Sequence, residues 1–299
     1  MNLFNKFAVR CVLIATSLLL AGCPKSQVRY SETLDRNALM VLAFPGWAPT
    51  GSEKIQSTDW SITTDAPGEA VAKAVTQAEV SPLYVVKLDD THAALVTQVL
   101  PVDESNRPYD HPASSGTIGA YFFEHSAAGW RIANRQHSVA TSGAGGNIGQ
   151  TGVTKLGEGH FAVTAQWGSC SQGYCGRWLV VVGLQRDRAT LLNSGIALSV
   201  NNDGAYGACS ALDNPAPVEE DTEEDPEEDT EVQNNECLDI QGQWKFRGNR
   251  LLVSYEGRLR QLDEHGEFLP IKKIQEQAIY EATRGELTLI SGSNPIPDF

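Results

Sequence analysis

No apolar run in this sequence reaches the roughly 20 residues that a membrane-spanning helix needs. The first strongly apolar stretch, residues 11–21, is short and follows a start that contains Lys6 and Arg10 and no acid. A basic start and a short apolar run are typical of a secretory signal peptide, which the mature protein loses. The sequence therefore favours an exported chain over one that keeps a transmembrane anchor.

Basic residues are also scarce. Lys and Arg total 23 against 37 Asp and Glu, which gives a formal net charge of −14. Removal of Lys6 and Arg10 with a signal peptide would change this charge to −16. Because nucleic-acid binding depends on clustered basic side chains, we expect no nucleic-acid partner.

Local motifs for catalysis and metal binding are missing as well. The six histidines form no HxH or HxxxH pair, and no GxSxG motif of a serine hydrolase is present. The glycine-rich segment 143–149 precedes a strand-like segment, whereas a phosphate loop requires a helix there. We expect no cofactor and no metal, and we interpret 143–149 as a flexible loop that could line a binding surface.

A short motif directly follows the apolar run: Leu20, Ala21, Gly22 and Cys23. At these residues the chain resembles the bacterial lipoprotein family, whose lipobox has this composition and position. The resemblance covers residues 1–23 only. It implies that the signal peptide is cut before Cys23, that this cysteine carries a thioether-linked lipid, and that the new amino group is acylated. Two or more acyl chains hold a protein stably on a membrane, whereas one holds it only marginally.

Pro24 occupies the position after the motif. In enteric members of the family an aspartate there retains the protein in the inner membrane. The resemblance therefore implies a lipid-anchored protein of the bacterial cell envelope, with the outer membrane favoured. The alternative is an ordinary signal peptide whose cysteine stays free.

Four cysteines remain after Cys11 leaves with the signal peptide and Cys23 takes the lipid. They are Cys170, Cys175, Cys209 and Cys237. An even number in an oxidising compartment suggests disulfides. We favour Cys170–Cys175, because a hairpin turn there would bring the two cysteines together. We also favour Cys209–Cys237, because closing that long loop would stabilise the fold by about 3–4 kcal/mol. The other pairings and four free thiols stay open.

Short runs rich in Val, Ile, Thr and aromatic residues recur from residue 81 onward, separated by Gly, Asp and Asn. Such runs are typical of β-strands, and the short turns between them indicate antiparallel pairing. Ala and Val recur at helical spacing in 68–79, which predicts the one helix. The apolar run 38–44 is expected to lead into a first strand.

Two segments offset by 68 residues, 87–98 and 155–166, match at five positions. Each is followed by a further hairpin, so 83–139 and 152–198 each predict a four-stranded meander. Repeated units of this kind are typical of propeller blades or stacked sheets. The predicted fold class is all-β: an antiparallel meander with internal repeats, propeller-like or sandwich-like, with one short helix. Convergent hairpin chemistry is the alternative explanation of the matches.

An acidic run separates two β-rich regions. Residues 219–231 contain ten acids with no base and no apolar residue, so this segment is expected to be disordered. The predicted divisions are a signal peptide at 1–22, a tether at 23–54, a repeat-containing β domain at 55–208, an acidic linker at 209–236 and a small C-terminal β unit at 237–299. Whether the last unit continues the preceding sheet stays open.

Aromatic residues give the strongest hint of function. Trp167 and Trp178 flank the hairpin CSQGYC, which carries Tyr174 near its tip. A rigid tip with an aromatic side chain suits a contact surface, while simple cross-strand packing of the two tryptophans is the alternative. We therefore expect a non-catalytic envelope lipoprotein, held on the membrane through Cys23, that binds another envelope protein or a cell-wall component. An inhibitor or immunity protein is one form of this role.

The competing hypothesis is an envelope hydrolase with a site assembled between the β repeats. His92 and His160 occupy equivalent positions of the two repeats. The hydrolase would require two or more of His92, His137 and His160 to meet a carboxylate in one pocket. This geometric requirement separates the two hypotheses.

Overall fold

The computed structural model describes residues 28–57, 77–203, 236–261, 263, 269–283 and 285–297. The helices in these ranges are α1 (Arg36–Ala43) and the short 3-10 helix η1 (Gly51–Lys54). The strands are β1 (Ile55–Ser57), β2 (Gln77–Lys87), β3 (His92–Pro101), β4 (Gly116–Ser126), β5 (Gly129–Ser142), β6 (Gln150–Gly157), β7 (His160–Ser171), β8 (Tyr174–Leu184), β9 (Ala189–Asn201), β10 (Glu236–Arg247), β11 (Arg250–Gln261), β12 (Lys272–Ala282) and β13 (Leu287–Gly292). The predicted all-β fold class is confirmed.

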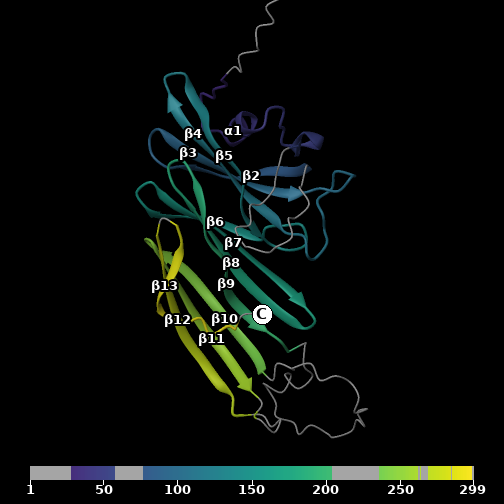
Figure 1. Ribbon diagram of the computed structural model, residues 1–299, viewed down its shortest axis with the longest axis vertical. Helices are drawn as coiled ribbons and strands as arrows, with labels where there is room; N and C mark the ends of the chain where they lie inside the picture. The colour runs from purple at the N-terminus through teal and green to yellow at the C-terminus, as the bar shows by residue number, and fades with distance from the viewer. Residues whose placement is uncertain are drawn as a thin grey trace, which may run out of the picture.

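The strands form two antiparallel sheets in which each strand pairs with its neighbour in the chain. One sheet has the order β1 to β5, and the other runs from β6 to β13. Figure 1 shows α1 and the five-stranded sheet at one end of an elongated molecule and β10–β13 at the other. The predicted meanders are β2–β5 and β6–β9, one in each sheet, and His92 and His160 begin the equivalent strands β3 and β7.

The two sheets share a buried core, so the sandwich-like alternative describes their packing. Phe122 from β4 is fully buried there with Val96 from β3 and Val182 from β8. Polar contacts join the same layers. The side chain of Gln136 in β5 donates to the Ala189 carbonyl at 3.0 Å and accepts from its amide at 2.6 Å.

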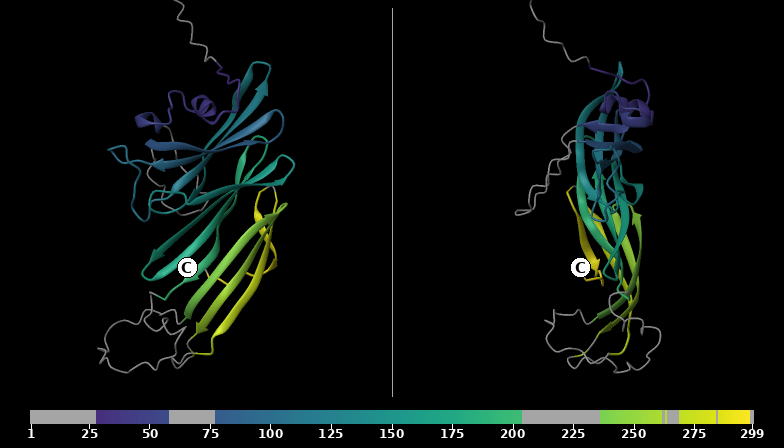
Figure 2. Two further views of the ribbon diagram at one scale, coloured as in Figure 1. Left: turned by 180° about the vertical axis from the view of Figure 1, so that it is seen from behind. Right: turned by 90° about the vertical axis from the view of Figure 1, so that its right-hand side faces the viewer.

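The eight-stranded sheet curls strongly, as Figure 2 shows in its two views. A second core packs β7 and β8 together with β9–β13. The indole Nε1 of Trp244 in β10 donates to Oε1 of Gln166 in β7 at 2.8 Å, although two strands lie between them in the sheet. The C-terminal strands therefore continue the sheet of the second meander, through the pairing of Ile240 with Val200. This pairing answers the question that the sequence left open.

The expected strand at 38–44 is wrong, because this segment forms α1. The Asp35 side chain caps the helix by accepting hydrogen bonds from the amides of Asn37 and Ala38 at 2.9 and 3.0 Å. Leu39 and Met40 are fully buried against the five-stranded sheet. A capping carboxylate and an apolar face of helical spacing thus outweigh the strand-like apolar run.

The expected helix at 68–79 is wrong at its C-terminal end. Residues 77–79 begin strand β2, where Ala78 is fully buried and pairs with Pro101. Pairing with β1 and β3 overrides the local helical spacing, because these residues complete the core beneath α1. Residues 68–76 lie outside the described residues.

The predicted signal peptide and Cys23 lie outside the described residues, so both stay predictions. Among the residues that the structure describes, no helix is long and apolar enough to cross a membrane. The acidic run 219–231 also lies outside them. Residues 28–35 precede α1. Within this segment, Ser31 forms an isolated antiparallel β-bridge with Trp130 of β5.

Candidate binding site

The hairpin between β7 and β8 is closed by a disulfide. Cys170 and Cys175 face each other in the strand register, with their Cα atoms 4.0 Å apart, and their sulfurs are bonded. The turn between the strands consists of Gln172 and Gly173. The ends of β7 and β8 are therefore held together both by this short turn and by the disulfide. The predicted Cys170–Cys175 bond is confirmed.

Cys237 in β10 is 4 % exposed and also disulfide-bonded. Its partner lies outside the described residues, as does Cys209, so the Cys209–Cys237 bond stays a prediction. Asn202 fixes the backbone on either side of Cys237. Its side-chain nitrogen donates to the Glu236 carbonyl at 2.6 Å, and its side-chain oxygen accepts from the Leu238 amide at 2.7 Å.

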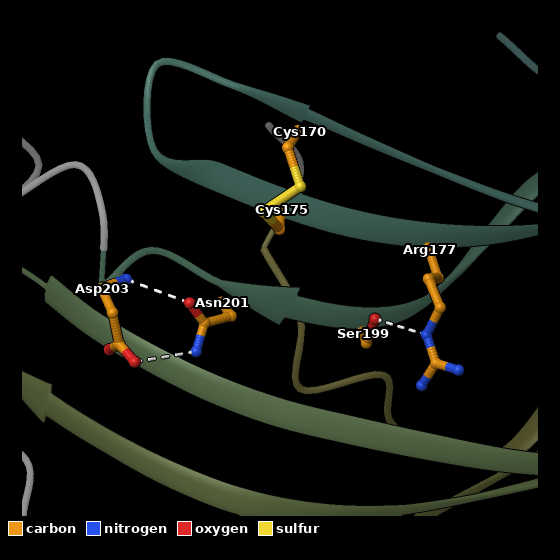
Figure 3. The surroundings of a disulfide bond; sticks show 6 residues. All are labelled: Cys170, Cys175, Arg177, Ser199, Asn201 and Asp203. Carbon is orange, nitrogen blue, oxygen red and sulfur yellow. Dashed lines mark hydrogen bonds between the residues drawn. A yellow bond between two sulfur atoms is a disulfide. The ribbon is translucent and has the colours of Figure 1, made fainter.

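A shallow hollow of about 400 Å³ lies beside the disulfide, which Figure 3 shows together with Arg177 and Ser199. Its one cationic side chain among the described lining residues is Arg177, whose Nε donates to Ser199 Oγ at 2.9 Å. Its Nη2 donates to Gln241 Oε1 at 2.6 Å. Arg177 therefore links β8 to β9 and β10, and we assign it a structural role.

Trp167 and Trp178 pair across the same hairpin, below the disulfide. Their ring centroids are 4.7 Å apart and the ring planes differ by 28°, so the two indoles stack. Both side chains are half-buried, and Trp167 packs on the core between the sheets. The Trp167 indole N–H is buried and has no hydrogen-bond partner among the described residues. The predicted cross-strand packing is present, and the same pair also borders a cavity.

This cavity, which we call the tryptophan pocket, has a volume of about 580 Å³ and is lined by residues of both sheets. Its described lining residues come from the segment before β4, the end of β5, the glycine-rich loop and strands β7–β9. They are Pro112, Ala113, Ser115, Thr141, Ser142, Gly143, Ala144, Trp167, Ser169, Trp178 and Ser194. None of these residues has a charged or titratable side chain. The pocket thus combines a flat apolar wall with a hydroxyl-bearing rim.

The glycine-rich loop 143–149 forms one side of the pocket, as expected for a loop that lines a surface, and makes hydrogen bonds within itself and to its neighbours. Asn147 Nδ2 donates to the Ala144 carbonyl at 2.6 Å inside the loop. The Gly146 amide donates to the Ser114 carbonyl at 2.9 Å, which ties the loop to the segment before β4. The pocket wall is therefore largely preformed.

The histidines have separate surroundings. His92 Nδ1 donates to Asp89 Oδ1 at 2.8 Å, and its Nε2 accepts from Arg186 Nε at 2.9 Å, so both ring nitrogens are engaged. His137 Nδ1 shares a hydrogen bond of 2.9 Å with the Tyr121 hydroxyl. His160 lines a cavity of about 210 Å³, and neither His92 nor His137 is among the described residues that line it. The convergence that the hydrolase hypothesis requires is not formed by these three described histidines.

The Asp89–His92–Arg186 contact predicts a pH-dependent contribution to stability. Burial alone raises the pKa of Asp89, but hydrogen bonds from His92 and Thr91 lower this pKa to about 2. Since the folded-state pKa lies below the ordinary value of 3.8, the contribution is present above about pH 4 and is lost as the pH falls toward 2. Asp89→Asn should lower the free energy of unfolding by about 0.2–1 kcal/mol at pH 7, because the group is largely exposed.

Urea unfolding of both proteins at pH 7 and near pH 2 measures this effect. The difference in the free energy of unfolding between Asp89→Asn and the parent protein should be smaller at the lower pH. Asp90→Asn is the matched control, because this neighbour has a side chain that is 98 % exposed and, among the described residues, forms an ion pair only with the exposed Lys87. A difference for Asp89→Asn that is equal at both pH values would contradict the assignment.

Comparisons of the chain with protein-family models, with curated proteins and with solved structures find no match. The assignment of a site therefore rests on geometry alone. Sequence reasoning singled out Trp167, Trp178 and the glycine-rich loop, and the structure brings them together. Sequence reasoning missed Ser115 and Ser194, because these residues lie far from the hairpin in sequence and no local pattern marks them.

Proposed function

We propose that this chain is a lipid-anchored protein of the bacterial cell envelope with a non-catalytic binding role. The anchor is proposed at Cys23, on the strength of the lipobox sequence Leu20 to Cys23. Two or more acyl chains would hold the mature protein stably on the membrane surface. The outer membrane is the proposed location, because Pro24 follows the cysteine.

The observation that carries the binding role is the composition of the tryptophan pocket. Its described lining has two indoles and several hydroxyls but no group that could transfer a proton near neutral pH. A preformed pocket with an apolar wall and a few polar groups is typical of ligand recognition. The disulfide of the β7–β8 hairpin supports this role, because it restrains the strands that carry both tryptophans.

Membrane attachment is tested by expressing the full chain with its own N-terminus in a diderm bacterium. We expect the protein in the outer-membrane fraction, and we expect Cys23→Ser to move nearly all of it to the soluble periplasmic fraction. Intact-mass analysis of the membrane form should show a diacylglyceryl group and an acyl chain on a chain that starts at Cys23.

The matched control is Cys11→Ser, which replaces another cysteine of the N-terminal region but lies inside the apolar run. This variant should fractionate like the parent protein. The proposal fails if Cys23→Ser stays in the membrane fraction at the parent level, or if the mass shows an unmodified thiol at this position.

A further inference from the structure

The tryptophan pocket has a composition that restricts the chemistry of its ligand. None of its described lining residues is charged, while the whole chain carries a net charge of −14. An anionic ligand would meet no cation among these lining residues. A cationic ligand would find no carboxylate in the lining to replace its hydration. The pocket therefore suits an uncharged ligand.

The apolar wall favours a ligand with flat, weakly polar faces. The indoles of Trp167 and Trp178 stack on each other and border the pocket as a pair, and the faces of aromatic rings carry negative charge density. Carbon-bound hydrogens with a small positive charge pack well against such faces. A β-glucopyranose ring has faces of this type, because its axial C–H bonds lie on its two faces while its hydroxyls lie around the ring edge.

The rim of the pocket offers hydroxyls that the described residues leave without a hydrogen-bond partner. The side-chain oxygens of Ser115, Ser169 and Ser194, together with Thr141, make no hydrogen bond within the described part of the chain. Each hydroxyl can donate one hydrogen bond and accept two. This dual capacity matches a ligand whose own edge consists of hydroxyls, whereas a proline-rich peptide offers only carbonyl acceptors.

The size of the pocket agrees with this chemistry. Its volume of about 580 Å³ lies within the range of about 300–1,000 Å³ that is usual for small-ligand sites. From these observations we infer that the tryptophan pocket binds an uncharged saccharide, with a sugar ring packed against the indole pair of Trp167 and Trp178 and its hydroxyls bound by the serines and threonine of the rim. This inference rests on the proposed binding role and names the ligand class.

Isothermal titration of the full lipidated protein tests the inference, in a detergent without a sugar headgroup. The neutral probes are the β-1,4-linked hexamers of glucose and of N-acetylglucosamine. We expect at least one of them to bind in the micromolar-to-millimolar range, and we expect hexagalacturonate, which is anionic, not to bind. Decaproline is the probe for the competing class of ligand.

Variants locate the binding. Trp178→Ala should weaken saccharide binding at least tenfold, while Trp178→Phe keeps a flat ring and should weaken it less than Trp178→Ala does. Ser194→Ala should weaken it about two- to tenfold, as expected for the loss of one neutral hydrogen bond. Tyr30→Ala is the matched control, because Tyr30 is an exposed aromatic outside the pocket, and it should bind like the parent protein. Near-ultraviolet circular dichroism confirms that each variant is folded.

Each remaining outcome overturns a defined part of the argument. Saccharide binding that Trp178→Ala leaves unchanged would overturn the location. Binding of decaproline alone, abolished by Trp178→Ala, would overturn the saccharide class and retain the pocket as a binding site. Failure of every probe on the folded protein would overturn the pocket as a ligand site. Attachment through Cys23 is measured separately and stands or falls by its own fractionation.

Discussion

Phe122→Ala should lower the free energy of unfolding by about 3–5 kcal/mol. Phe122 is fully buried in β4 and belongs to the core that the two sheets share. Its removal would leave a cavity between layers, because backbone hydrogen bonds of β3 and β5 hold β4 on both sides. Urea unfolding followed by tryptophan fluorescence, with the disulfides kept oxidised, measures the change from the midpoint and slope.

Leu289→Ala provides the control for this substitution. Leu289 lies on the edge strand β13 and is 43 % exposed, so the change in stability should stay within about 0.5 kcal/mol. A loss below about 1 kcal/mol for Phe122→Ala would mean that the two sheets do not share a close-packed core. The stacking of the two meanders would then need revision.

Gly149→Ala should lower the free energy of unfolding by about 2–4 kcal/mol. Gly149 has a φ of +83°, which side chains other than hydrogen rarely allow. A Cβ at this position would lie 2.2 Å from the Gln166 carbonyl oxygen and 2.8 Å from the Trp167 Cβ. The substitution should therefore displace β7 beside the tryptophan pocket as well as destabilise the fold.

Gly145→Ala separates backbone strain from this steric clash. Gly145 lies in the same loop with a φ of +60°, but no atom lies within 4 Å of a Cβ built there. This variant should lose only the roughly 1–2 kcal/mol that a left-handed backbone costs. The two losses are compared by urea unfolding. Equal losses would show that β7 does not pack closely against the glycine-rich loop.

Much of the β-structure could be predicted because its signals are local. Alternating apolar residues and short polar turns define each hairpin, and the turns at 89–91 and 186–188 lie between strands as expected. The Cys170–Cys175 bond followed from the same reasoning, since a turn between two strands forces the cysteines to face each other. The pairing of Trp167 with Trp178 was predictable for the same reason.

Other features depend on distant parts of the chain. The segment 38–44 is apolar at nearly every position, so its pattern alone cannot distinguish a strand from a buried helix. The capping bond from Asp35 and the packing of Leu39 on the sheet decide the outcome. In the same way, Ser115 and Ser194 line one pocket only because the two sheets pack together.

The order of the strands bears on how such a chain could fold while it is being synthesised. Within the described residues, every sheet partner of a strand is its immediate neighbour in the chain. In a chain that is made from its N-terminus, each new strand of a sheet can therefore pair with the strand made just before it. Mostly local pairing of this kind lowers the entropy lost before contacts form and shortens the exposure of unpaired strand edges.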